Sequence, residues 1–165
     1  MDGFPMTIRP MVTGDIGTVV QLENKIYPQP WSERAFEDEL AQDNRHYLVV
    51  EGDDGLVGYA GMFVIENDAH ITTVAVIDEL QGMGLGTRLI LQLVDAARQG
   101  GASSLTLEVR LTNYRARDIY RRFGFVPAGV RKDYYRDDDA LIMWAHDIED
   151  DAYTARIEEI RRSLR

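Results

Sequence analysis

The chain has 165 residues, 45% of them apolar and 28% charged, which is enough for one buried core and too few to predict two domains. Its net charge of −10 argues against a nucleic-acid binder, which needs a phosphate-neutralising surface, and is compatible with a cationic acceptor. The absence of cysteine excludes disulfides, thiolate metal ligands and a cysteine nucleophile.

The histidines and the apolar segments bear on metal binding and on membrane insertion. His46, His70 and His146 are scattered and lack a ligand spacing, so we expect no metal site. No run of 18 apolar residues is present, and the stretch MDGFPMTIRP lacks the regions of a secretory signal. We therefore expect a cytoplasmic protein that binds neither membrane nor nucleic acid, and that is a monomer or a weak dimer.

The first third of the chain predicts a short strand, two helices and a hairpin. Residues 7–9 read as a strand, and Asp15 is placed to cap the helix that follows. A proline-broken loop over 27–31 precedes a second helix, which begins after Ser32 and reaches about Ala41. Apolar runs at 46–51 and 56–65, joined by the turn Gly-Asp-Asp-Gly, predict an antiparallel hairpin, with a third strand at 69–76.

The rest of the chain alternates between helical and strand patterns. We expect helices over 84–99, 112–123 and 152–164, and strands at 103–109, 125–131 and 140–147. A meander followed by strand–helix–strand units predicts an α/β fold, in which a mixed sheet has helices on both faces. We expect one domain over 1–150 and a helical extension over 151–165, which either docks on the core or on a second copy of the chain, or remains a solvated tail.

Residues 81–88, QGMGLGTR, place three glycines in front of a predicted helix. A P-loop requires a lysine after its last glycine, and a dinucleotide fingerprint follows its strand directly, whereas Asp78–Gln81 intervene here. Two interpretations remain open: a glycine-rich turn without a ligand, or backbone amides and a helix start that bind a pyrophosphate.

The strand ending in VAV, followed by Q-x-x-G-x-G, resembles the acetyl-CoA-binding motif of the GNAT N-acetyltransferases. The resemblance implies acetyl-CoA as cosubstrate, with loop amides on its pyrophosphate and strand backbone on its pantetheine arm. The coenzyme-binding residues it implies are Val74, Ala75 and Val76 in the strand and Gln81, Gly82, Met83, Gly84, Leu85, Gly86, Thr87 and Arg88 in the loop and helix start.

A second constellation occupies LEVRLTNYRARDIYRRFGF, residues 107–125. Strand alternation separates Glu108 from the aliphatic face, and helical spacing places Tyr120 on the same face as Ala116 and Phe123. From position alone, a solvated glutamate and a core tyrosine are the ordinary alternatives.

Several motifs in this region and beyond it resemble the RimI-type branch, which acetylates the N-terminal alanine of a small-subunit ribosomal protein. The resemblance spans roughly residues 7–147 and implies Glu108 as proton acceptor, Tyr120 as proton donor and Asn113 as a coenzyme contact. Because both substrates can bind together and no covalent enzyme intermediate is needed, we expect direct transfer in a ternary complex. The matching residues are Pro30-Trp31-Ser32, Leu107 to Arg110, Asn113, Ala116, Tyr120, Gly124, Phe125, Arg131, Tyr134, Tyr135, Ala140, Ile142 and Met143.

The ordinary pKa of a glutamate limits how well Glu108 can act as a base. A carboxylate that titrates near ~4.3 is a weak base, so we expect Glu108 to be partly buried or to act through a water molecule. A phenol that titrates near ~10 suits protonation of a departing thiolate.

Aromatic residues in predicted loops, Trp31, Tyr134 and Tyr135, are candidates for binding an acceptor peptide, although Trp31 could equally pin its loop to the core. Asp133 and Arg136 depart from the branch pattern. Two rival functions stay open: an acetyltransferase acting on a lysine or a small amine such as a polyamine or antibiotic, and a non-catalytic acyl-CoA-binding module.

Overall fold

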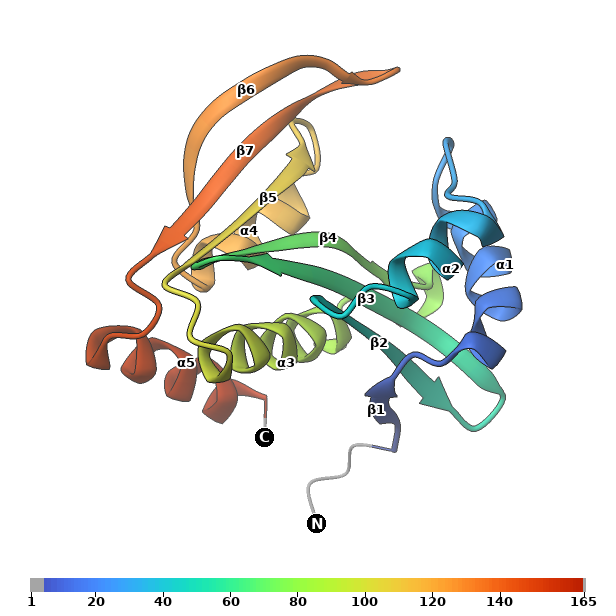
Figure 1. Cartoon of the computed structure of the whole chain (residues 1–165), viewed down its shortest axis with the longest axis horizontal. Coiled ribbons are helices and arrows are strands. Elements are labelled where there is room, and N and C mark those ends of the chain that lie inside the picture. The colour runs from blue at the N-terminus through green and yellow to red at the C-terminus, as the bar shows by residue number, and fades with distance from the viewer. Residues whose placement is uncertain (1–4, 165) are drawn as a thin grey trace. The chain divides into compact units, whose positions relative to one another are not determined.

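The computed structural model of the chain describes residues 5–164 (Figure 1). Its strands form a seven-stranded sheet in the order β1-β2-β3-β4-β5-β7-β6, in which β4 and β5 are parallel and the hairpins are antiparallel. The expected α/β class with a mixed sheet is therefore confirmed. The elements are β1 (Thr7–Pro10), η1 (Thr13–Asp15), α1 (Ile16–Ile26), α2 (Glu33–Leu40), β2 (Arg45–Gly52), β3 (Gly55–Ile65), β4 (Asp68–Val76), η2 (Asp78–Leu80), α3 (Leu85–Gln99), β5 (Ser104–Arg110), α4 (Tyr114–Arg122), β6 (Val126–Tyr135), β7 (Asp138–His146) and α5 (Asp151–Ser163).

The described residues group into two compact units that share three continuous elements. The first unit contains the residues up to Phe63 together with Thr73–Leu93, and the second contains Val64–Thr72 together with the residues from Val94 onwards. Strands β3 and β4 and helix α3 each pass from one unit to the other. None of the helices within residues 5–164 has the length and apolar character needed to cross a membrane.

In the first unit, α1 and α2 pack onto the β1–β3 meander through an apolar cluster. Phe36 from α2 is fully buried and meets the ring of Tyr59 edge-on, with 6.1 Å between ring centroids. The buried Glu23 accepts hydrogen bonds from the Tyr59 hydroxyl and from the backbone N–H of Trp31, so the loop that follows α1 is fastened to the core.

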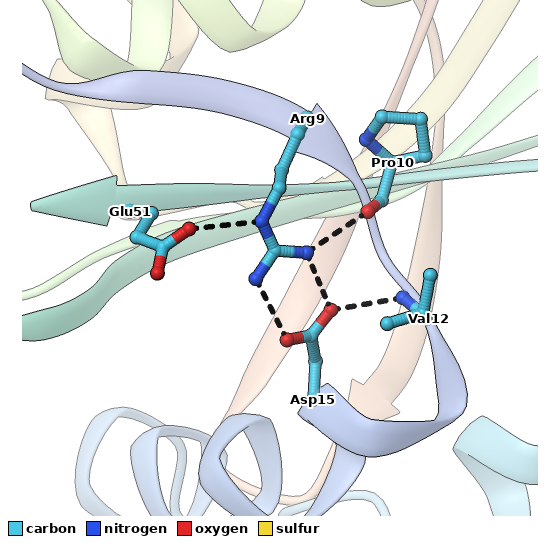
Figure 2. Close-up of polar contacts among 5 residues, drawn as sticks. All are labelled: Arg9, Pro10, Val12, Asp15 and Glu51. Carbon is cyan, nitrogen blue, oxygen red and sulfur yellow. Dashed lines mark hydrogen bonds and ion pairs between the residues drawn. The ribbon is translucent and has the colours of Figure 1, made fainter.

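The start of α1 differs from the expectation that Asp15 caps this helix. Figure 2 shows that the Asp15 carboxylate instead receives both Nη atoms of Arg9, at 2.8 and 2.9 Å, and the N–H of Val12 at 2.9 Å. The hydrogen bond from Arg9 holds the pKa of Asp15 below its ordinary value. A bidentate ion pair therefore occupies the oxygens that a cap would use, and the capping prediction was wrong.

The predicted start of α2 is confirmed, because Ser32 Oγ accepts the N–H of Ala35 at 3.1 Å.

In the second unit, β5, β7 and β6 lie side by side, with β6 and β7 forming a long hairpin (Figure 1). The predicted strand over 125–131 was too short, because β6 continues to Tyr135. Asp133 adopts a positive φ of 54° within an irregular stretch of the ladder, and pairing resumes between Tyr135 and Asp138. Tyr134 and Tyr135 therefore lie at the end of a strand and not in a loop.

Helix α5 also belongs to the second unit and is packed, which excludes the alternative of a solvated tail. Tyr153, Ile157 and Ile160 are buried, as the helical spacing predicted. The Tyr153 hydroxyl donates to the carbonyl of Phe123 at 2.6 Å, and Arg161 pairs with Asp95 of α3 at 3.1 Å.

Candidate active site

The glycine loop lies in the first unit, between η2 and α3. Gly82 and Gly84 both have φ of 85°, a left-handed conformation that glycine adopts without steric cost. Gly86 has no atom within 4 Å of the place where a Cβ would stand. Together with the positive end of the 15-residue helix α3, these features fit the binding of a pyrophosphate.

The side chains of this segment serve different purposes. Leu85 and Thr87 are buried, whereas Met83 is 63% exposed. The Gln81 amide donates to the carbonyl of Val76 at 3.3 Å and to Asp78 at 3.2 Å, which folds the loop back onto the end of β4. Any contacts of Leu85 and Thr87 with a coenzyme would therefore come from their backbones.

The carbonyl groups at the end of β4, over residues 74–76, lie in contact with other parts of the first unit. Tyr27 of α1's C-terminal side donates its hydroxyl to Val74 O at 3.4 Å. A Cβ on Gly58 would stand 2.8 Å from the carbonyl oxygen of Ala75, so only glycine allows this approach of β3. The carbonyls of Val74 and Val76 thus already accept hydrogen bonds within the first unit.

In the second unit the structure brings Glu108 of β5 together with His70 of β4. The parallel register aligns His70 with Thr106, and Glu108 stands two residues further along β5 on the same face as Thr106. As a result His70 Nε2 and Glu108 Oε2 are 2.6 Å apart. Sequence reasoning tested His70 only as a metal ligand and missed this contact, because it depends on the pairing of two strands that are distant in the sequence.

A cation lies beside the other oxygen of this carboxylate. Arg131 of β6 places Nη1 3.4 Å from Glu108 Oε1, so the two carboxylate oxygens have different partners. The Glu108 side chain is 14% exposed, which confirms the expected partial burial. Its pKa is nevertheless lowered: the hydrogen bond with His70 contributes most and opposes desolvation, and the interactions with Arg131 lower the pKa further. Burial therefore does not make Glu108 a stronger base, contrary to the simplest sequence-based expectation.

Tyr120 and Asn113 lie on α4 and at its start. Tyr120 is buried and its ring meets Phe125 edge-on at 5.6 Å, which is the packing that the core alternative predicted. Asn113 caps α4, with Oδ1 accepting the N–H of Ala116 at 3.2 Å. The Asp138 carboxylate fastens the preceding loop through the backbone N–H and hydroxyl of Thr112, at 3.1 and 2.6 Å.

The three aromatic candidates belong to different units. Trp31, in the first unit, is half-buried against Phe36 with 5.3 Å between ring centroids, so it does pin its loop to the core. In the second unit, Tyr134 is 47% exposed and meets the ring of Tyr135 at 5.0 Å. Burial and the neighbouring Glu108 charge raise the pKa of Tyr134.

Comparison with known proteins places this geometry in a family. The sequence profile of the acetyltransferase (GNAT) family matches residues 16–125. The chain belongs to the GNAT acetyltransferase family. The matched part includes the glycine loop, Glu108 and Tyr120, and ends before β6. As a family member the chain is an acyltransferase that uses acetyl-CoA, and the predicted resemblance is confirmed.

Individual GNAT relatives are also similar. The chain is 40% identical over 140 residues to a putative ribosomal protein bS18-alanine N-acetyltransferase of Bacillus subtilis, covering 83% of this chain and 93% of that protein. It is 35% identical to the N-alpha-acetyltransferase RimI of Mycobacterium tuberculosis, covering 94% of each chain. The crystal structure of the ribosomal-protein-S18-alanine N-acetyltransferase from Escherichia coli is 29% identical with a TM-score of 0.79, covering 86% of this chain and 94% of that one.

Within the described residues, no three His, Asp or Glu side chains are arranged to hold a metal ion.

The His70–Glu108 contact predicts a pH-dependent stability. Because the pKa of Glu108 is lowered in the folded state, the contact stabilises the protein above the ordinary glutamate pKa of about 4.5, and this stabilisation is lost as the pH falls through the folded-state value. His70→Gln should reduce the free energy of unfolding by about 1–2 kcal/mol at pH 6.5, and by less at pH 3.5.

Urea unfolding at both pH values measures this difference. His46→Gln is the matched control, because His46 is exposed on β2. An equal loss for His70→Gln at both pH values would contradict the assigned role of the Glu108 charge.

Proposed function

We propose that the chain transfers the acetyl group of acetyl-CoA to the N-terminal α-amino group of a protein, the N-terminal alanine of the ribosomal protein bS18. The half-buried, ionised Glu108 in the family-matched segment carries the proposal for the chemistry. The names of the relatives at 40% and 35% identity support the choice of acceptor. A ribosomal-protein acceptor agrees with a cytoplasmic location.

The weakness of Glu108 as a base favours an α-amine over a lysine or a polyamine. An α-amino group titrates near ~7.8, so losing its proton at neutral pH costs about 1 kcal/mol, whereas an alkylamine near ~10.4 costs about 4–5 kcal/mol. Since the pKa of Glu108 is lowered, it serves best where little driving force is required.

His70 holds the carboxylate in place for proton transfer. The acceptor ammonium transfers its proton to Glu108 Oε1, while the N–H of His70 Nε2 donates to Oε2 across the 2.6 Å contact. Glu108 then releases this proton to solvent and is ionised again.

Transfer is direct. The amine nitrogen attacks the thioester carbonyl carbon while a backbone N–H near Val76 donates to its oxygen, and the C–S bond then breaks. Tyr120 protonates the departing thiolate and regains a proton as the attacking nitrogen loses its second one. Asn113 and the residues of the glycine loop hold the coenzyme. With no cysteine in the chain, a thioester on the enzyme is not part of the mechanism.

We assign the transferase domain to residues 1–150 and regard 151–165 as an extension. The start of α5 at Asp151, outside the family match, supports this division.

The acceptor assignment predicts a ranking of substrates. Release of coenzyme A should be fastest with an alanine-starting peptide, and much slower with spermidine or with a lysine peptide whose N-terminus is blocked.

Glu108→Gln should lower kcat by about a hundredfold because the proton acceptor is lost, while acetyl-CoA still binds. Glu149→Gln, an exposed charge change, is the control. Preference for spermidine or lysine would refute the acceptor class, and coenzyme binding without turnover would favour a binding module.

We also propose that Trp31, Tyr134 and Tyr135 contact the acceptor peptide. The exposure of Tyr134 close to Glu108 supports this assignment. Tyr134→Ala and Trp31→Ala should each raise KM for peptide several-fold and leave KM for acetyl-CoA unchanged. Val126→Ala, which is 56% exposed on the same strand as Tyr134, is the control for β6. Equal changes in both KM values would contradict the assignment, and thermal unfolding separates loss of packing at Trp31 from loss of binding.

A further inference from the structure

Arg131 occupies a distinctive position on β6. Its Nη1 lies 3.4 Å from Glu108 Oε1, while His70 takes the other oxygen at 2.6 Å. Its guanidinium carbon also lies 4.7 Å from the centroid of the Tyr134 ring. The Arg131 side chain is 54% exposed, so it is a movable cation paired with a half-buried carboxylate.

The oxygen held by Arg131 is the one that an acceptor ammonium needs, because Oε2 is committed to His70. Two cations then compete for Oε1. We propose that Arg131 is a specificity-determining residue of the proposed N-terminal acetylation: it holds Glu108 Oε1 until an acceptor peptide displaces it. This inference rests on the proposed function.

The competition favours peptides over small amines. A displaced guanidinium keeps its contact with Tyr134 but loses a charge-assisted hydrogen bond. A peptide offers backbone carbonyls beyond its first residue that can accept the five N–H donors of the guanidinium, whereas a small amine offers none. Partly exposed ion pairs are weak: breaking one changes an equilibrium constant by a factor of about two to five. The correct acceptor therefore needs little binding free energy to displace Arg131.

The groups that face Glu108 come from β4, which is adjacent to β5, and from β6, which lies on the far side of β7. His70 faces it from β4, and Arg131 and Tyr134 face it from β6. On β7 the residue paired with Glu108 is the uncharged Ile142. Removing the Arg131 charge should therefore raise the pKa of Glu108, because Arg131 is one of the groups that lower it.

Acceptor competition tests the inference. For Arg131→Gln, the ratio of kcat/KM for an alanine-starting peptide to that for alanine amide should fall about threefold or more, chiefly through a lower KM for alanine amide. Lys132→Gln removes the same charge from the next, exposed residue of β6 and should leave the ratio unchanged. An unchanged ratio in Arg131→Gln, or an equal fall in Lys132→Gln, would overturn the inference.

A second measurement tests the Arg131–Glu108 contact without an activity assay. Carboxyl-carbon NMR of the free protein should show Glu108 titrating at higher pH in Arg131→Gln, and close to its original value in Arg131→Lys, which retains the cation. If the proposed function is wrong, the unaltered protein will acetylate neither acceptor although this shift is present. If the Arg131 inference alone is wrong, the peptide is acetylated and Glu108 titrates alike in Arg131→Gln and Lys132→Gln.

Discussion

The hydrogen bond between His70 and Glu108 depends on the register of two parallel strands. A slip of one residue between β4 and β5 would turn one of the two side chains to the opposite face and separate the pair. The same register leaves Glu108 Oε1 toward Arg131. The placement of the proton acceptor, the preference for a weakly basic amine and the competition at Oε1 all follow from this one pairing.

The contacts of Glu108 with His70 and Arg131 keep the carboxylate ionised and make it a weaker base. A stronger base would require a raised pKa, which an apolar pocket provides and which the hydrogen bond with His70 and the charge of Arg131 oppose. The site therefore suits an acceptor whose amine is already close to losing its proton, and much of the rate then has to come from positioning of the two substrates. The glycine loop matches that requirement, because Gly82 and Gly84 fix a backbone that no other residue adopts as easily.

Local chemistry made much of the fold predictable. Ser32 as a helix cap, the hairpin between β2 and β3, and the helix that begins after the glycine loop depend on neighbours within a few residues, and their predictions are confirmed. Asp15 was misassigned because Arg9 forms a stronger ion pair with it than a helix N–H provides. The length of β6 was missed because the chain at Asp133 departs from regular geometry and then resumes pairing with β7. The His70 contact required the strand register, which no local pattern encodes.

The most direct test of the account is a crystal structure with a conjugate of coenzyme A and an alanine-starting peptide. We predict that the alanine nitrogen lies about 2.6–3.2 Å from Glu108 Oε1, or one water molecule away, with Oε2 still on His70 and Arg131 displaced. A nitrogen that approaches a different carboxylate, or a Glu108 that has left His70, would contradict it.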